Sequence, residues 1–461
     1  MIQLHRLPAP ARHLVASAYG LTLLRQRYGP DARERVAEIL ERDHWSPSRW
    51  KTWMENRLAW ILHRAATQVP YYRELWGKRR QRGDRTSFEY LENWPVLAKE
   101  EIRRHAEAFL VEGFPPRRML HDRTGGTTGT PLRVWLTRET NRTLYALYEA
   151  RVRFWNGLTR REPWATLGGR LVAPADAARP PYWVHNWPMR HLYLSSGNIG
   201  AQTVRDYLCA LTRHRATHLV AYTSAAACLA AHAHQAEVPA PPRLRLVVTN
   251  AEGLFPWQRA AIREGLGCPA IETYGMVELA ACASERDGAL RVWPEVGHVE
   301  VLNDGEDRPV GAGDSGRLIC TGLLNAEMPL IRYDVGDRGR IGGPQPPLPY
   351  PVLEKVEGRQ TEMLSTASGQ RVWYFNPVFA DLPVVEAQLI QEAPGTIRVL
   401  YVPALEFDAA GHHATIEERL AARLGPVAVR FEPMARVPRE HNGKFRPVIN
   451  RTVATDPSSA G

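Results

Sequence analysis

The stretch HDRTGGTTGTPLRVWLT, from His121 to Thr137, is the most informative part of the sequence. It places three glycines and four threonines in the seven positions from Thr124 to Thr130. Glycines let the backbone turn with its N–H groups pointing inward, and threonine hydroxyls add further donors. Such a loop suits phosphate oxygens, although a tight hairpin without a ligand would use the same residues. The Walker A form is excluded, because no Gly-Lys-Ser or Gly-Lys-Thr closes the loop.

The bulk composition is that of a large globular enzyme. The chain has 461 residues, 44% of them apolar and 23% charged, so two or three domains are expected. No apolar run reaches the roughly 18 residues of a membrane span, and the first residues lack the apolar core of a signal peptide. The five cysteines are scattered and form no CxxC pair, so we expect no disulfide framework and a reducing, cytoplasmic location.

The formal net charge of +10 could attract nucleic acid, an acidic lipid surface or phosphorylated small molecules. Nucleic acid is disfavoured, because the arginines are spread evenly and form no basic block. Only five of the 59 basic residues are lysines. Each lysine is therefore a candidate for a position that needs a compact ammonium group, with chance survival on the surface as the alternative.

The order of expected elements predicts an α/β protein with a separate C-terminal module. Residues 1–115 show apolar residues at helical spacing and are expected to be mostly helical. Residues 116–360 alternate strands with helices, which is typical of a layered α/β body. Residues 361–461 are expected to form a compact α+β module of ordinary domain size, with strands at 385–393 and 396–403.

Five further motifs follow the Thr/Gly loop in order. They are TNAEGLF (249–255), ETYGMVEL (272–279), IRYDVGD (331–337), EGRQTEML (357–364) and VPREHNGKFRPVIN (437–450). Together they resemble the ordered signature of the adenylate-forming superfamily, which includes acyl- and aryl-CoA synthetases, and most closely its phenylacetate–CoA ligase and capsular-polysaccharide branch. The resemblance covers nearly the whole chain. It implies a large multi-layer N-terminal domain and a small mobile C-terminal lid.

The resemblance also implies a set of nucleotide-binding residues. Tyr274 is expected to stack on adenine, Asp337 to accept from the ribose hydroxyls, and Arg359 to contact ribose or phosphate. A core tyrosine and a surface ion pair are the alternatives for Tyr274 and Arg359. The other nucleotide-binding positions are Thr124, Gly125, Gly126, Thr127, Thr128, Gly129, Asn250, Glu252 and Gly275.

Two residues are expected to carry the chemistry. Lys444 follows the turn dipeptide Asn-Gly, and in the family the matching lysine enters the site from the small domain to bridge carboxylate and α-phosphate oxygens. Its presence in a lysine-poor chain supports that role, with an exposed turn lysine as the alternative. Glu278 resembles the family's magnesium-binding carboxylate, since a hard cation prefers carboxylate and phosphate oxygens.

The sequence departs from the family pattern in two places. A threonine or serine commonly precedes the magnesium glutamate, but Val277 stands here and cannot contact phosphate through a hydroxyl. The family's hinge is usually Asp or Lys, and Glu362 takes that place. Some relatives in this branch also carry a Cys/His metal cluster, for which Cys282 and His298 offer too few partners, so no structural zinc is expected.

The cofactors implied are ATP and magnesium, with coenzyme A as the expected acyl acceptor. The acid is expected to be aryl or short and apolar, bound near Ser196, Tyr222, Asn250 and Met276, although packing of aromatic residues against the core explains that region equally well. An amine or a carrier-protein pantetheine is the alternative acceptor. A non-catalytic scaffold that retains the fold is a weaker alternative, supported only by Val277.

Overall fold

The structure is a computed structural model that describes most of the chain. The described residues are 4–124, 131–170, 172–174, 177–311, 313–359, 363–372, 375, 378–379, 381–439 and 445–452. Within them, no helix combines the length and the apolar character that a membrane span needs. The chain divides by its contacts into two compact units. Unit 1 comprises Met1–Thr22, Leu158–Glu272 and Glu357–Gly461, and unit 2 comprises Leu23–Gly157 and Thr273–Val356.

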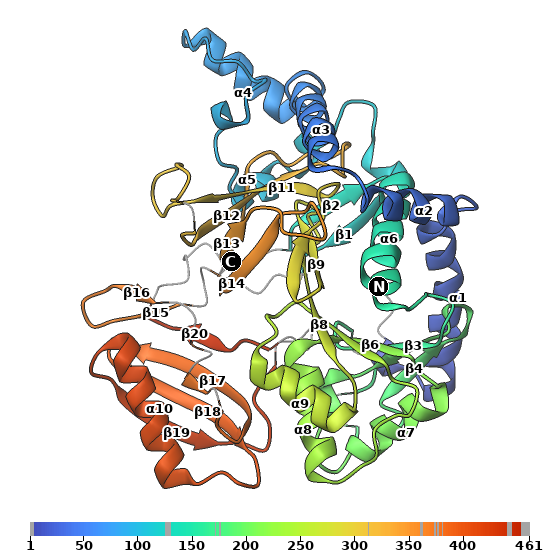
Figure 1. Ribbon diagram of the computed structural model, residues 1–461, viewed down its shortest axis with the longest axis vertical. Helices are drawn as coiled ribbons and strands as arrows, with labels where there is room; N and C mark the ends of the chain where they lie inside the picture. The colour runs from blue at the N-terminus through green and yellow to red at the C-terminus, as the bar shows by residue number, and fades with distance from the viewer. Residues whose placement is uncertain are drawn as a thin grey trace. The chain divides into compact units, whose positions relative to one another are not determined.

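A mostly parallel sheet forms the centre of unit 1. Its strand order is β4-β5-β3-β6-β7-β8, with β4 antiparallel at the edge. The strands are β3 (Trp164–Leu167), β4 (Trp183–Asn186), β5 (His191–Leu194), β6 (His218–Tyr222), β7 (Leu246–Asn250) and β8 (Ala270–Gly275). Helices α7 (Val204–His214), α8 (Thr223–Gln235) and α9 (Pro256–Leu266) accompany them, and α8 lies beside α9 (Figure 1). The alternation of strand and helix predicted this layered body, because a parallel connection needs a crossover helix.

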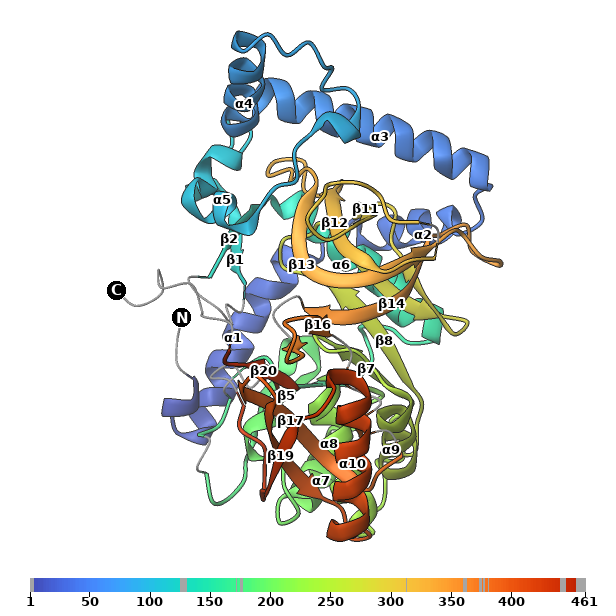
Figure 2. The ribbon, with the colours of Figure 1, turned by 90° about the vertical axis from the view of Figure 1, so that its left-hand side faces the viewer.

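The C-terminal part of unit 1 is a four-stranded sheet with one helix. The sheet order is β19-β18-β17-β20, and helix α10 (Ala409–Leu424) packs along one face (Figures 1 and 2). The strands are β17 (Val384–Ala393), β18 (Thr396–Pro403), β19 (Ala428–Pro433) and β20 (Val448–Asn450), preceded by the short pair β15 (Leu364–Ser365) and β16 (Arg371–Val372). Ile416, Leu420 and Leu424 recur at helical spacing and are buried against the sheet. The predicted α+β module is therefore present.

Unit 2 combines a second sheet with helices from the N-terminal third of the chain. Its strands run in the order β8-β9-β10-β14-β13-β12-β11. They are β9 (Cys282–Arg286), β10 (Ala289–Val292), β11 (Gly297–Leu302), β12 (Gly316–Gly322), β13 (Tyr333–Gly342) and β14 (Val352–Arg359); the separate hairpin is β1 (Leu120–Arg123) and β2 (Arg133–Leu136). The helices are α2 (Ala32–Arg42), α3 (Pro47–Gln68), α4 (Pro70–Gln81), α5 (Lys99–Arg104) and α6 (Arg138–Tyr148).

Local sequence signals explain where the long N-terminal helices begin. Helix α3 starts at Pro47 after Ser46, whose hydroxyl accepts a hydrogen bond from the Arg49 N–H at 3.2 Å. Proline suits the first helical position and serine the cap before it. A second proline, Pro70, starts α4 after a single intervening residue, so the two helices follow each other with a change of direction (Figure 2). The α/β fold class predicted from the sequence is confirmed.

The predicted division at residues 115/116 and 360/361 differs from the division by contacts. Helix α1 (Ala9–Arg27) and strands β8 and β14 each contribute residues to both units. Glu357–Gly461 groups with Leu158–Glu272 rather than standing alone. The three-part division of the chain into domains stays a prediction.

Helix α1 is held to strand β4 by a group of histidines. The ring centroids of His13 and His185 lie 5.3 Å apart, and those of His185 and His214 lie 5.5 Å apart. The backbone N–H of His185 donates a hydrogen bond to His13 Nδ1 at 3.1 Å. Burial, reinforced by the other two histidines, lowers the pKa of His185 to about 4. Burial and the neighbouring histidines therefore disfavour protonation of His185 in the folded state.

We expect acid to destabilise unit 1 through this histidine group. Because the folded-state pKa of His185 is depressed below about 6.5, its unfolded value, the unfolded chain binds more protons between about pH 6.5 and 4, and stability falls as the pH falls through that range. Thermal denaturation should show a smaller loss of Tm between pH 7 and pH 5 for His185→Gln than for the unmodified protein. An equal loss in both proteins would contradict this explanation.

Candidate active site

The Thr/Gly loop connects the two strands of the β1–β2 hairpin. Thr124 closes the hairpin with two hydrogen bonds, because its N–H donates to the Leu132 carbonyl and its hydroxyl accepts from the Leu132 N–H, both at 2.9 Å. The hairpin therefore fixes both ends of the loop. Gly125, Gly126, Thr127, Thr128 and Gly129 lie outside the described residues.

Tyr274 and Asp337 meet at the carboxyl end of β8. The Tyr274 hydroxyl donates to Asp337 Oδ2 at 2.8 Å, and both side chains are half-buried. Tyr274 packs partly against the core of unit 2, and Gly275 beside it is exposed. An aromatic face and a carboxylate thus lie side by side at a strand end. This is the juxtaposition that binding of a nucleoside requires, since a base can stack and a ribose can donate.

Glu278 is a buried carboxylate with two partners on one oxygen. Only 6% of the residue is exposed, and its Oε1 accepts from the Tyr333 hydroxyl at 2.8 Å and from Lys99 Nζ at 3.0 Å. Lys99 is the first residue of α5, and Tyr333 the first of β13. Three separate segments of unit 2 therefore converge on this carboxylate. Burial of a charged group without such partners would be costly.

The Lys99 contact bears on the magnesium expected at Glu278. One carboxylate fits a hard cation if phosphate oxygens complete the ligand set. The ammonium of Lys99 already supplies a positive charge beside that carboxylate. Within the described residues, no group of three or more His, Cys, Asp or Glu side chains could hold a metal ion. Val277 packs partly against the core of unit 2 rather than serving as a polar group.

Three of the residues expected near the acid lie at or just after the carboxyl ends of parallel strands in the sheet of unit 1. Ser196 follows β5, while Tyr222 and Asn250 end β6 and β7 and are directly paired in register. Because β5, β3, β6 and β7 are parallel neighbours, these residues share the carboxyl edge of the sheet, where open α/β sheets bind ligands. Gly168 at the end of β3 has a φ of +110°, and a Cβ there would lie 2.7 Å from the Tyr222 ring. Glycine is therefore required beneath that ring.

Glu252, which is expected to bind the nucleotide, accepts hydrogen bonds from two backbone amides. Its Oε2 accepts from the Ser224 N–H in the first turn of α8 at 2.7 Å, and its Oε1 accepts from the Phe445 N–H at 3.3 Å. A carboxylate at a helix N-terminus is stabilised by the free N–H groups and the helix dipole. The carboxylate thereby joins the C-terminal module to the parallel sheet within unit 1.

Arg439 supplies a second connection between the same parts of unit 1. Its guanidinium pairs with the buried carboxylate of Glu386 and donates to the Ser224 hydroxyl at 2.9 Å. Burial raises the pKa of Glu386, while the Arg439 charge opposes that rise. Phe445 packs in the core cluster of the parallel sheet, and Arg439 lies 4.8 Å from its ring centroid. Both residues that flank 440–444 are thus anchored to α8 and its capping carboxylate.

The other expected residues are placed as follows. Arg359 is the last residue of β14 and is half-buried. Met276 lies just after β8 and packs partly against the core of unit 2. Lys444 and Glu362 lie outside the described residues. Cys282 is buried in β9, where burial raises the pKa of its thiol to about 12.

Sequence reasoning did not assign Lys99, Tyr333 or Arg439 to the site. A signal existed for each of them. Lys99 is one of only five lysines, and Tyr333 and Arg439 lie inside the motifs 331–337 and 437–450. What the sequence could not show was that α5 brings Lys99 to a carboxylate 179 positions further along the chain.

Comparison with known proteins gives a consistent result. A family model described as the CapK C-terminal domain matches residues 364–451. Protein CapK from Staphylococcus aureus is 21% identical over 96% of this chain and 97% of its own length. The phenylacetate-coenzyme A ligase of Pseudomonas putida is 23% identical over 67% of this chain and 70% of its own length.

Solved structures show the same fold. A 2-hydroxyisobutyryl-CoA ligase in the postadenylation state, in complex with an acyl-AMP, superposes with a TM-score of 0.67 at 18% identity, covering 92% of this chain and 94% of the other. The anthranilate CoA ligase AuaEII in complex with anthranoyl-AMP gives a TM-score of 0.52 at 16% identity, covering 73% and 67%.

Removal of the Lys99 charge should destabilise the folded state. We expect Lys99→Met to lower the free energy of unfolding by about 1–3 kcal/mol, because the Glu278 carboxylate stays buried and loses its cationic partner. Chemical denaturation measures the change. The double variant Lys99→Met with Glu278→Gln should recover part of the loss, and an additive loss in the double variant would contradict the coupling.

Loss of the Glu252 carboxylate should loosen the C-terminal module. We expect Glu252→Gln to increase hydrogen exchange at the Ser224 and Phe445 amides at least several-fold, because the neutral amide oxygen is a weaker acceptor. Exchange measured by mass spectrometry on peptides that begin several residues before each amide, such as residues 219–235 and 440–452, checks this. Peptides from α10 serve as the internal control and should be unchanged.

Proposed function

Because this chain belongs to the adenylate-forming superfamily, in the branch that contains CapK and the phenylacetate-coenzyme A ligases, we propose that it activates a carboxylic acid with ATP and transfers the acyl group to coenzyme A. The carboxylate oxygen attacks the α-phosphorus, and the bond to the β-phosphate oxygen breaks to release pyrophosphate. The thiolate then attacks the acyl carbon of the mixed anhydride and AMP leaves. An aryl or short apolar acid is the substrate class we propose.

The observation that carries the proposal is the hydrogen-bonded pair of Tyr274 and Asp337. The pair places a ring and a carboxylate together at a strand end, with an exposed glycine, Gly275, beside them. In the proposed site Tyr274 stacks on the adenine and Asp337 accepts from the ribose. The loop that starts at Thr124 surrounds the phosphates with N–H groups and hydroxyls.

Two positive charges are proposed to offset the negative charges that meet in the first step: the Lys444 ammonium and a magnesium ion at Glu278. Glu278 would hold magnesium together with phosphate oxygens, and the metal would neutralise the charge on the departing pyrophosphate. Lys444 is proposed to stand between the carboxylate and the α-phosphate, where two anionic groups approach each other. The contacts of Arg439 and Phe445 favour this role, because both neighbours of 440–444 are anchored.

The remaining residues are proposed to contact the nucleotide, to line the acid site or to serve as the hinge. Arg359 contacts ribose or phosphate, and Ser196, Tyr222, Asn250 and Met276 line the acid site. The ends of β6 and β7 support the assignment of Tyr222 and Asn250, since ligands of open parallel sheets bind at that edge. Rotation of the C-terminal module about the segment that includes Glu362 would separate the two steps.

Acid-dependent exchange of labelled pyrophosphate into ATP tests the first step. We expect exchange with at least one member of a panel of aryl and short acids, and a loss of about 10²-fold or more in Lys444→Ala, because the approach of two anions loses its cation. Asp337→Asn should raise the KM for ATP more than it lowers kcat. Lys355→Ala is the matched control, as a lysine without a proposed role.

The second step is tested by adding acceptors after adenylation. Coenzyme A should give a thioester, whereas hydroxylamine alone gives a hydroxamate from any accumulated adenylate. Product formation only with an amine or a phosphopantetheinylated carrier would replace coenzyme A by that acceptor. Tight ATP binding without exchange for any acid would favour the non-catalytic scaffold.

A further inference from the structure

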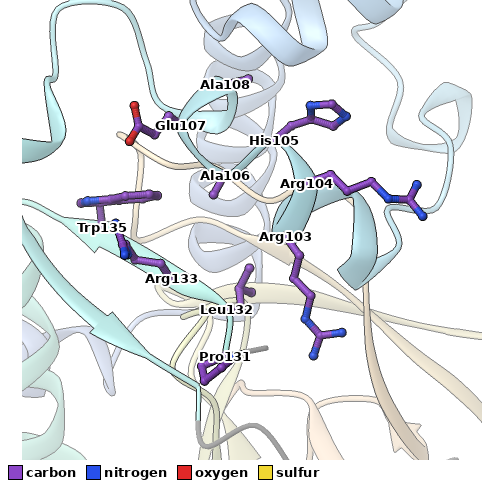
Figure 3. A pocket seen from close by; sticks show the side chains of 10 residues that line it. All are labelled: Arg103, Arg104, His105, Ala106, Glu107, Ala108, Pro131, Leu132, Arg133 and Trp135. Atoms are coloured by element: carbon purple, nitrogen blue, oxygen red, sulfur yellow. The ribbon is translucent and has the colours of Figure 1, made fainter. Parts of the chain in front are cut away.

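A basic pocket lies between the end of α5 and the start of β2 in unit 2. Its volume is about 440 Å³, and it lies within the usual range of small-molecule sites. One wall comes from residues 103–108 and the other from residues 131–135 (Figure 3). The lining residues are Arg103, Arg104, His105, Ala106, Glu107, Ala108, Pro131, Leu132, Arg133 and Trp135.

The charges of the lining are predominantly positive. The lining contains three arginines and a histidine but only one carboxylate, that of Glu107. Arg103 and Arg104 each donate one hydrogen bond of 2.9 Å to a glutamate three residues earlier in α5. A guanidinium has five N–H donors, so these pairs leave most of the donors of both arginines available.

Two arginines are particularly suited to hold an anion. Arg103 points toward Pro131 and Leu132 across the pocket (Figure 3), and its Nε is a buried donor with no acceptor among the described residues. Arg133 is exposed on β2, with its guanidinium carbon 5.6 Å from the centroid of the buried Trp135 ring. This distance is within the range of a cation–π contact. The planar fork of a guanidinium matches the oxygens of a phosphate group.

The two walls of the pocket lead directly to the proposed ATP site. Helix α5 begins at Lys99, which pairs with Glu278, and Arg103 follows one turn later, about 6 Å along the helix axis. Strand β2 begins just after the Thr/Gly loop, whose end at Leu132 is fixed by Thr124. A ligand in the pocket would therefore contact the strand that follows the proposed phosphate loop and the helix whose first residue pairs with Glu278.

We propose that this pocket is a second anion site, which binds a phosphate group separately from the Thr/Gly loop, with Arg103 and Arg133 on its two walls as the main sources of positive charge. The inference rests on the proposed function for its two sources of phosphate. One is pyrophosphate released in the first step, and the other is the 3′-phosphate of coenzyme A. The pocket volume is larger than a lone phosphate needs and accommodates a phosphorylated sugar.

Calorimetric titration of the full chain tests the proposal without turnover. The protein is first saturated with a non-hydrolysable ATP analogue and magnesium, so that the Thr/Gly loop is occupied. Pyrophosphate, coenzyme A and 3′-dephospho-coenzyme A are then titrated separately. We expect at least one phosphate-bearing probe to bind with one site per chain. The double variant Arg103→Gln with Arg133→Gln should weaken that binding tenfold or more.

The choice of probe distinguishes the two sources. Tighter binding of coenzyme A than of its 3′-dephospho form, with the difference lost in the double variant, identifies the 3′-phosphate. Binding of pyrophosphate that is lost in the double variant, without discrimination between the two coenzymes, identifies the leaving group.

Two further variants keep the result interpretable. Arg117→Gln with Arg118→Gln removes the same charge from exposed arginines outside the pocket and should leave binding unchanged. Arg103→Lys with Arg133→Lys keeps the charge but removes the planar forks, and it should bind several-fold more weakly than the unmodified protein. Melting curves identify any variant that fails to fold.

The proposal is overturned if none of the three probes binds, if the folded double glutamine variant binds as tightly as the unmodified protein, or if the Arg117/Arg118 control weakens binding equally. Pyrophosphate exchange is measured in parallel on the same preparations. Exchange that persists while these binding results fail overturns the anion site alone, whereas absent exchange overturns the proposed function.

Discussion

The buried carboxylate of Glu278 is the constraint on which the organisation of unit 2 depends. A carboxylate with 6% exposure must have partners, and here they come from two distant parts of the chain, Lys99 and Tyr333. The contact with Lys99 fixes the start of α5, and the contact with Tyr333 fixes the start of β13. Through these two elements the carboxylate relates the β8–β9 turn to the basic pocket and to the strand that carries Asp337.

A comparable arrangement holds the C-terminal module within unit 1. Glu252 accepts from a backbone amide of α8 and from one next to residues 440–444, while Arg439 bonds the Ser224 hydroxyl. These contacts are few and polar, and they are accompanied by a small number of apolar residues such as Val385 and Phe445. The rotation proposed for this module would have to break these contacts, including the buried pair of Arg439 and Glu386.

The two sets of contacts have a chemical logic in common. In each, a carboxylate that is buried (Glu278) or half-buried (Glu252) accepts hydrogen bonds from segments that the proposed mechanism uses: α5 and β13 in one case, a neighbour of Lys444 in the other. The same residues therefore serve stability and position the proposed site. Substitutions at Glu278 or Glu252 would change folding and activity together, so variants with retained shape, such as glutamine, are needed to separate the two effects.

The sequence by itself predicted the fold class, the α+β module and a resemblance to the adenylate-forming superfamily. Strand and helix periods are local properties, and six ordered motifs identify a family regardless of how the chain packs. It also indicated Tyr274 and Asp337 as separate motif residues, but their 2.8 Å hydrogen bond depends on the distance between β8 and β13 in space.

Only the tertiary structure decided which charges meet. The pairing of Lys99 with Glu278 and the anchoring role of Glu252 join residues far apart in the chain, and no local pattern encodes such pairs. The basic pocket is a further example, since residues 103–108 and 131–135 are unremarkable apart and form a site only because α5 and β2 lie side by side. Local physics fixes the elements of this protein, whereas the burial of its charges fixes how they are combined.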